Sequence, residues 1–118
     1  MANSAADIIR KGASDLLILT LLSEKERYGY EIRKEIEQRS RGLYNLSEGA
    51  LYVFLYRLSE DGYISERRET VGKRRVRVYY GLNEKGEEYR KALSKEYASV
   101  SKGLEYFYSF EGGQDDVK

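Results

Sequence analysis

The chain has 118 residues, with 21 lysines and arginines against 20 aspartates and glutamates. This length allows one compact domain and excludes a two-domain enzyme. Cysteine and histidine are both absent, which excludes disulfides, thiolate or imidazole metal sites, and Ser/His or Cys/His catalytic pairs. The sequence also shows neither a convergent carboxylate pair nor a glycine-rich phosphate loop. We therefore expect no enzyme, no cofactor and no metal.

The apolar segments indicate where the chain is located, and its charges indicate which partners it has. The longest apolar stretch, residues 16–22, is far too short to span a membrane, and the first fifteen residues lack the layout of a signal peptide. We expect a soluble cytoplasmic protein without a membrane contact. With a net charge of +1, global charge neither attracts nor repels nucleic acid, so the distribution of charge must indicate the partner.

Apolar periodicity and capping residues predict two helices in the first third of the chain. Ser14 and Asp15 can cap a first helix that runs to residue 22, is buried nearly all round, and could be extended backwards by residues 8–9. A polar linker follows. Residues 28–39 then place apolar side chains at every fourth position, which predicts an amphipathic surface helix.

The third predicted helix carries the first candidate site. Ser47 is a suitable N-cap, and Gly62 ends the helix. At about 100° per residue, one face is apolar and packs inward, whereas the opposite face presents small and aromatic groups rather than a run of charges. The residues of this outer face are Gly49, Tyr52, Val53, Tyr56 and Glu60.

Two β-prone runs, residues 64–70 and 75–82, surround the tripeptide at positions 72–74 and predict a hairpin with one wet face. Six basic residues against two acidic ones give this region a local excess of +4. The basic residues are Arg67, Arg68, Lys73, Arg74, Arg75 and Arg77. A charge run is often only a solvated turn, but this one directly follows a helix whose outer face is cleared, which favours contact with DNA.

A last helix is expected to begin after Asn83, which is a suitable N-cap. Its apolar side chains recur at spacings of four and three, and they are Tyr89, Leu93, Tyr97, Val100, Leu104 and Phe107. A helix that projects after the hairpin has little of its own domain to cover it, so we expect this stripe to form a homodimer interface; packing back onto its own domain is the alternative. Alternation in residues 104–110 also fits a strand, and residues 111–118 should fray.

Three short helices followed by a hairpin with a basic tip is the order of a winged helix-turn-helix, whose third helix enters the DNA major groove while the hairpin reaches the flanking backbone or minor groove. The expected fold is therefore mainly α with a small β-hairpin: a winged helix-turn-helix domain at residues 1–82 and a C-terminal dimerisation helix at residues 83–110. The expected partner is double-stranded DNA. The residues expected to contact it are Ser47, Gly49, Tyr52, Tyr56, Arg57, Lys73, Arg74, Arg75 and Arg77.

Several of these features have a second interpretation. Tyr52 and Tyr56 can instead be partly buried against the first helix, and Arg57 can pair within its own helix with Glu60 or Asp61. A winged helix can also bind proteins rather than DNA with the same surface. Aromatic residues near the C-terminus fit either a small-molecule site at the dimer interface or simple interface packing; they are Tyr97, Tyr106, Phe107, Tyr108 and Phe110.

Three motifs in one order carry a resemblance to a known family. They are YGYEI at residues 28–32, G-x-LY-x-x-L-x-RL-x-x-x-G at residues 49–62, and YY-x-L-x-x-x-G at residues 79–86. Over residues 14–90 the chain resembles the PadR family of bacterial and archaeal transcriptional regulators, and the short last helix is similar to the short branch of that family.

The resemblance implies a homodimeric winged-helix repressor in which the C-terminal and N-terminal helices build the dimer. It also implies release from DNA when a small aromatic or amphipathic compound binds. Two-fold symmetry then predicts a pseudo-palindromic operator with half-sites about 34 to 36 Å apart. Val53 departs from the proline that usually follows LY and restores a backbone donor, whereas Asn83 replaces the usual threonine and keeps the capping chemistry.

Overall fold

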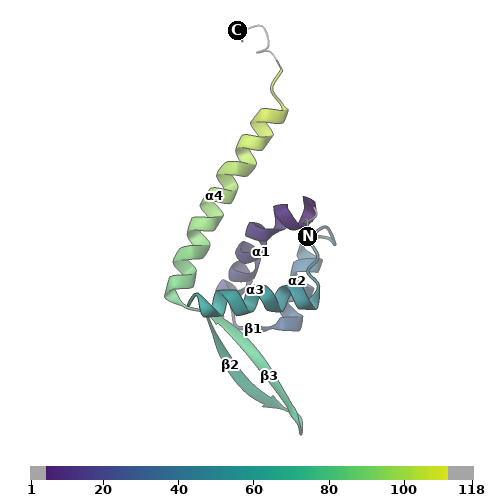
Figure 1. Ribbon diagram of the computed structural model, residues 1–118, viewed down its shortest axis with the longest axis vertical. Helices are drawn as coiled ribbons and strands as arrows, with labels where there is room; N and C mark the ends of the chain where they lie inside the picture. The colour runs from purple at the N-terminus through teal and green to yellow at the C-terminus, as the bar shows by residue number, and fades with distance from the viewer. Residues whose placement is uncertain (1–4, 112–118) are drawn as a thin grey trace.

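The computed structural model describes residues 5–111, with side chains from residue 11 onward. Three helices form a compact head, from which a β-hairpin and a long fourth helix project in opposite directions (Figure 1). The elements are α1 (Ala5–Glu24), β1 (Arg27–Tyr28), α2 (Gly29–Arg39), α3 (Glu48–Glu60), β2 (Ile64–Val71), β3 (Arg75–Leu82) and α4 (Glu84–Tyr108). This arrangement confirms the predicted winged helix-turn-helix followed by a C-terminal helix. Within residues 5–111, no helix combines the length and the apolar character needed to cross a membrane.

The core lies between α1, α2 and α3. Ile18 and Leu19 of α1 are completely buried, as is Ile32 of α2. The inward stripe of α3 meets them with residues that are 0–1% exposed, namely Leu51, Leu55 and Leu58. Burial of side chains of this size contributes about 1.5–3 kcal/mol each to folding, so the apolar periodicity read from the sequence accounts for how the head is assembled.

The beginning of α1 differs from the expectation. The helix starts at Ala5 rather than at Ser14, so Ser14 and Asp15 lie in its interior and do not cap it. Both side chains are buried, at 0% and 4% exposure. The Ser14 hydroxyl is within 2.6 Å of the Tyr44 hydroxyl, in the segment that leads to α3. The capping prediction was wrong because a polar pair before an apolar run can also be an internal polar junction, and only packing distinguishes the two.

The sheet contains a third strand that the sequence did not indicate. Its order is β1-β3-β2, all antiparallel, with Arg27 opposite Tyr80 and Tyr28 opposite Tyr79. Arg27, expected in a polar linker, is only 6% exposed, and its guanidinium donates to the carbonyl of Leu21 and to the Glu24 carboxylate. A strand of two residues has no periodicity to detect, so only the long-range pairing reveals it.

The caps and turns expected around α3 and the hairpin are confirmed. The Ser47 hydroxyl accepts a hydrogen bond from the Ala50 amide at 3.1 Å, and Gly62, with φ of +83°, follows the C-cap residue Asp61. Strands β2 and β3 pair from Ile64 opposite Leu82 to Val71 opposite Arg75. Residues 72–74 form the connecting turn, in which Gly72 has a φ of +68°.

Helix α4 is anchored at its base and free along its outer part. The Asn83 side chain accepts from the Gly86 amide at 2.8 Å, which confirms the N-cap. Tyr89 stacks on Tyr63 with 4.3 Å between ring centroids, and Leu93 packs against the core. Both residues are partly buried against their own head, and their expected place in a dimer interface stays a prediction; the apolar stripe of α4 is mostly exposed from Tyr97 onward. The helix ends at Tyr108, so the strand alternative for residues 104–110 was wrong.

Beyond Leu93 the apolar side chains of α4 face solvent within the protomer. Tyr97 is 51% exposed and Phe107 is 70% exposed. The remaining large hydrophobic residues of this segment are more than half exposed: Val100, Leu104, Tyr106, Tyr108 and Phe110. The fraying expected for residues 111–118 concerns positions that, after Glu111, lie outside the described residues.

Candidate nucleic-acid interface

The outer face of α3 is open and, apart from Glu60 at its C-terminal end, carries small, aliphatic and aromatic groups rather than charges. Tyr56 is 67% exposed and Val53 is 66% exposed, while nothing lies within 4 Å of the position that a Cβ on Gly49 would occupy. Tyr52 is 43% exposed, and its hydroxyl lies against Gly29, where a Cβ would come within 2.5 Å of it. Tyr52 is therefore partly covered by the start of α2.

Arg57 has a different partner from either of those expected within its helix. Its guanidinium donates two hydrogen bonds to the Asp15 carboxylate, at 2.8 and 3.2 Å. These bonds raise the pKa of Arg57 above its ordinary value. The Arg57 side chain is still 41% exposed, whereas Asp15 is 6% exposed. An arginine held in this way is oriented toward α1, so its place among the DNA-contacting residues stays a prediction that this contact weakens.

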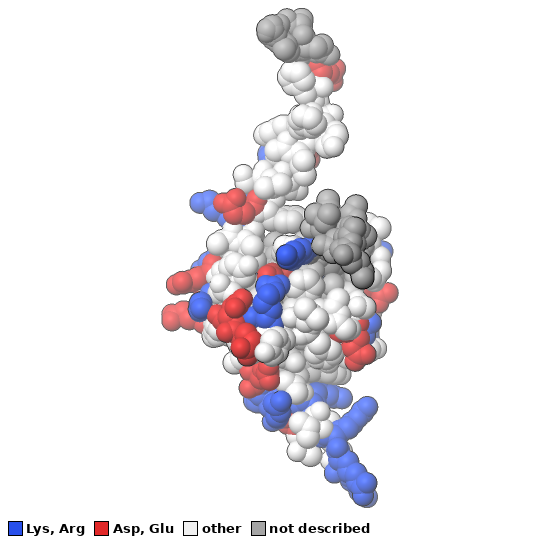
Figure 2. Space-filling model, viewed as in Figure 1, with Lys and Arg blue, Asp and Glu red and all other residues white. Residues whose placement is uncertain are grey.

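The hairpin formed by β2, β3 and their turn is here called the wing. Its tip carries the exposed positive charge. Figure 2 shows Lys and Arg gathered at the lower end of the molecule, over the tip of β2 and β3. Lys73, Arg74 and Arg75 are exposed, and no ion pair joins them to a carboxylate within residues 5–111. Unpaired arginines and lysines on a projecting ribbon are suited to contact phosphate groups.

The part of the wing nearer the head has less free charge than the sequence count suggested. Arg67 donates to Glu26 at 2.9 Å and to Glu69 at 2.7 Å, and Arg68 lies 3.8 Å from Glu66. Two of the six basic residues are thus already paired. The positive charge that is not paired with a carboxylate is therefore concentrated at the tip of the wing.

A groove of about 480 Å³ between the wing and α3 brings together residues from both candidate regions. Tyr52 lines one side, and Arg75 and Arg77 line the other. Tyr28 and Tyr30 contribute two aromatic rings that the sequence reading had not assigned to a site. Arg77 lies over the Tyr28 ring, 4.0 Å from its centroid. None of the described residues that line this groove carries a carboxylate.

One of the tyrosines that line this groove, Tyr80, is buried. Tyr80 is 7% exposed, and this burial raises the pKa of its hydroxyl above the ordinary value. At neutral pH the hydroxyl is protonated, as that of an ordinary tyrosine also is. Together with the two arginines, the groove offers hydrogen-bond donors and positive charge, the chemistry that sugar-phosphate groups bind.

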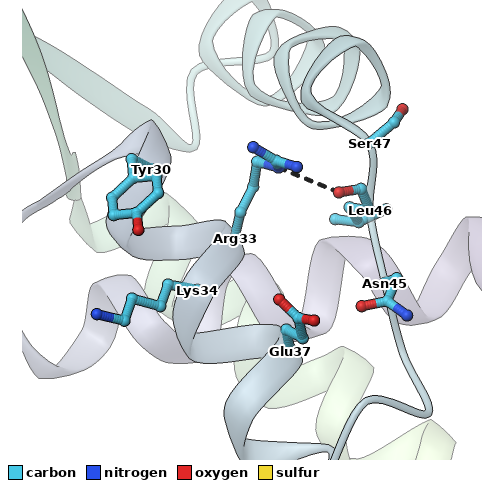
Figure 3. A pocket seen from close by; sticks show the side chains of 7 residues that line it. All are labelled: Tyr30, Arg33, Lys34, Glu37, Asn45, Leu46 and Ser47. Atoms are coloured by element: carbon cyan, nitrogen blue, oxygen red, sulfur yellow. Dashed lines mark hydrogen bonds between the residues drawn. The ribbon is translucent and has the colours of Figure 1, made fainter.

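A second groove, of about 450 Å³, lies on the other side of the α3 N-terminus (Figure 3). Arg33 of α2 reaches across it, and its Nε donates to the carbonyl of Leu46 at 3.1 Å, just before the N-cap Ser47. Lys34 lines the same groove, and Glu37 supplies a negative charge. Sequence analysis did not single out Arg33 or Lys34, because nothing in the sequence placed them beside α3.

Comparison with known proteins agrees with this geometry. The model of the PadR-like family of transcriptional regulators matches residues 18–92. An uncharacterized protein of Lysinibacillus sphaericus is 37% identical over 102 residues, which cover 86% of this chain and 93% of that protein. The transcriptional regulator YqjI of Escherichia coli strain K12 is 38% identical over 65 residues, or 55% of this chain, but the match spans only 31% of YqjI.

Solved structures show the same architecture. A transcriptional regulator from Clostridium thermocellum superposes with a TM-score of 0.79 at 34% identity, over 85% of this chain and 97% of that one. A PadR-like transcriptional regulator from Bacillus cereus gives a TM-score of 0.75 at 25% identity, over 88% and 99% of the two chains. By sequence and by fold, the chain belongs to the PadR-like family of DNA-binding transcriptional regulators, which are not enzymes.

Proposed function

We propose that the chain acts in the cytoplasm as a homodimeric repressor that binds a pseudo-palindromic operator. The α3 helices of the two protomers enter successive major grooves about 34 to 36 Å apart. The wing tips hold the flanking phosphates, and occupancy of the operator blocks a promoter. The residues assigned to this contact are those of the outer face of α3 and of the wing: Ser47, Gly49, Tyr52, Tyr56, Lys73, Arg74, Arg75 and Arg77.

The observation that carries the proposal is the groove between α3 and the wing. Tyr52 of α3 faces Arg75 and Arg77 of β3 across a space of about 480 Å³, and the described residues that line it include no carboxylate. Tyrosine hydroxyls and arginines are frequent donors to phosphate oxygens, and such contacts set the register of a protein on the duplex. The groove therefore offers a path for one DNA backbone, with Tyr56 beyond it in position to reach base edges.

The dimer is proposed from the outer part of α4. The stripe formed by Tyr97, Val100, Leu104 and Phe107 is 51–70% exposed in the protomer. Exposed apolar surface of this extent is typical of an interaction site. Because the stripe lies along one helix, a two-fold axis beside that helix would bury it against the same stripe of a second copy.

An effector site is proposed beside the same stripe. A groove of about 260 Å³ between α1 and α4 is lined mainly by apolar groups, including Leu16, Leu93 and Tyr97. A small aromatic compound could stack there and bind differently to two orientations of the heads. Differential affinity of this kind is what release from DNA requires.

The proposal is tested with a duplex taken from upstream of the gene, with binding measured by fluorescence anisotropy between about 50 and 200 mM salt. The triple variant Lys73→Ala/Arg74→Ala/Arg75→Ala is compared with the wild type. Each lost phosphate contact lowers the salt slope by about 0.9, so three contacts lower it by about 2.7, with a similar loss of affinity for every sequence. Tyr56→Ala is expected to change the preference between sequences and to leave the salt slope unaltered.

The matched control removes three positive charges from the face of α4 opposite the apolar stripe, as Lys91→Ala/Lys95→Ala/Lys102→Ala. It should leave the salt slope unchanged, because these side chains lie away from both grooves. Equal effects of the two triple variants would show that only net charge matters and would overturn the assignment of the wing. Binding that is insensitive to salt would favour a protein partner instead of DNA.

A further inference from the structure

One buried carboxylate is shared by the three helices that control where α3 points. Asp15 lies in the middle of α1 with its side chain 6% exposed. Its two oxygens accept hydrogen bonds from the guanidinium of Arg57 in α3, at 2.8 and 3.2 Å. The Tyr89 hydroxyl of α4 donates to the same carboxylate at 3.5 Å. The carboxylate thus joins the candidate recognition helix to the base of the candidate dimerisation helix.

The core contacts between α1 and α3 are apolar, and they are less directional than an ion pair. Leu51, Leu55 and Leu58 pack against α1 through dispersion and burial, which tolerate small rotations of a helix about its own axis. A bidentate arginine-carboxylate pair is planar and directional. Arg57 thus adds a directional contact to the apolar ones, and it directly follows Tyr56, whose side chain is exposed.

The contact from α4 is also held in place. The Tyr89 ring is stacked on Tyr63 at an interplanar angle of 16°, which fixes the direction of its hydroxyl. Like any tyrosine hydroxyl, it is protonated at neutral pH and can donate, and desolvation raises its pKa further above the ordinary value. A change in the tilt of α4 would move this donor relative to Asp15.

We infer that Asp15 is a positioning residue for DNA recognition: its buried carboxylate fixes the rotation of α3 through Arg57 and ties that helix to the base of α4 through Tyr89. The inference rests on the proposed function, because it assumes that the outer face of α3 reads base edges. It assigns Arg57 an internal role in place of a phosphate contact. It also identifies a route by which the orientation of α4 affects the reading of DNA.

The test measures discrimination between an operator duplex and a scrambled duplex of equal length, using the full chain at a temperature where circular dichroism shows each variant to be folded. Asp15→Asn keeps the size of the side chain and removes its charge. We expect the affinity for the operator to fall about tenfold, with the affinity for the scrambled duplex and the salt slope unchanged, since no phosphate contact is lost. Glu88→Gln is the control, because it makes the same charge change at an exposed position of α4 that lies outside the groove between α3 and the wing.

Variants of Arg57 separate positioning from direct contact. Arg57→Gln should reproduce the tenfold loss, and the double variant with Asp15→Asn should be no worse than either single one, because both break the same interaction. Arg57→Lys keeps the charge and one hydrogen bond but not the planar pair, so its discrimination should fall between the wild type and Arg57→Gln. If Arg57→Gln instead lowers the salt slope by about 0.9 and weakens both duplexes equally, Arg57 contacts phosphate and the inference is overturned.

The link to α4 has its own variant. Tyr89→Phe keeps the stacked ring and removes only the hydroxyl, and it should lower discrimination by about two- to threefold. An unchanged value for Tyr89→Phe overturns the link to α4. Full discrimination by Asp15→Asn, or a loss that follows the folded fraction alone, overturns the role of Asp15. If the wild type itself does not discriminate between the two duplexes, it is the proposed function that fails.

Discussion

The wing and the outer part of α4 both project from the head, in opposite directions (Figure 1). Both leave side chains without cover from the protomer. The wing tip carries Lys73, Arg74 and Arg75, whereas the outer part of α4 carries mainly aliphatic and aromatic groups. In Figure 2 the first region is blue and the second mostly white. Both projections are exposed, so exposure alone does not indicate which partner each one binds. The chemistry of their side chains does, because charged and apolar groups suit different partners.

The two projections also differ in how they are joined to the head. The wing continues directly from the sheet, where β3 pairs with both β1 and β2. Helix α4 is anchored at its base, by the stacking of Tyr89 on Tyr63, by the hydrogen bond from the Tyr89 hydroxyl to Asp15 and by the packing of Leu93 on the core. The wing should thus stay in register with the head, while the outer part of α4 depends on a second copy for cover.

The largest expected effect comes from introducing a charge into the apolar stripe on the outer part of α4. Leu104→Asp places a charge in the middle of the exposed stripe of α4, where a dimer would bury it. We expect sedimentation equilibrium to report the monomer mass at micromolar concentration. Affinity for a two-site operator should fall by about 10²- to 10⁴-fold, because the second half-site no longer benefits from linkage to the first.

The control for this variant is Ser99→Asp, which introduces the same charge on the opposite side of the helix at about 100° per residue. It should leave both the mass and the affinity close to those of the wild type. A dimer that survives Leu104→Asp would show that the stripe is not the interface and that the two projections do not divide their roles as proposed.

A smaller effect tests the attachment of α4. Gly86 is buried, and a Cβ at this position would overlap the carbonyl oxygen of Tyr63. We expect Gly86→Ala to lower the free energy of unfolding by about 1–3 kcal/mol, as overpacking usually does. Gly103 of the same helix has nothing within 4 Å of its Cβ position, so Gly103→Ala should raise the free energy of unfolding by about 0.5–1 kcal/mol. Urea denaturation measures both, and equal effects would contradict an anchored base and a free outer part.

The smallest effect concerns the head that carries both projections. Hydrogen bonds from Arg39, and then from Arg27, lower the pKa of Glu24 from 4.5 to about 2. Because the pKa is lower in the folded state, this carboxylate stabilises the fold above about pH 4.5, and its contribution is lost as the pH falls toward 2. The difference in melting temperature between the wild type and Glu24→Gln should therefore shrink over this range. A difference that is independent of pH would show that the ion pair does not hold the end of α1 to α2.

Local signals predicted much of this structure. Ser47, Gly62 and Asn83 have capping or turn chemistry that acts over three or four residues, and each occupies the expected position. The turn of the hairpin and the inward stripe of α3 follow from patterns of the same short range. The motifs at residues 28–32, 49–62 and 79–86 also indicated the correct family.

The sequence by itself determined the helices, the hairpin and the placing of positive charge on its tip, because caps, periodicity and turn residues act between neighbours in the chain. Only the tertiary structure decided which charges are free. Arg57 is held by Asp15, 42 residues away, and Arg67 by Glu26, 41 residues away. The tertiary structure also decided that Tyr89 and Leu93 pack against their own head, and that the Tyr28 ring lies beside Arg77 in the groove. Contacts of this kind depend on how the helices and the sheet pack against one another, and no local pattern encodes them.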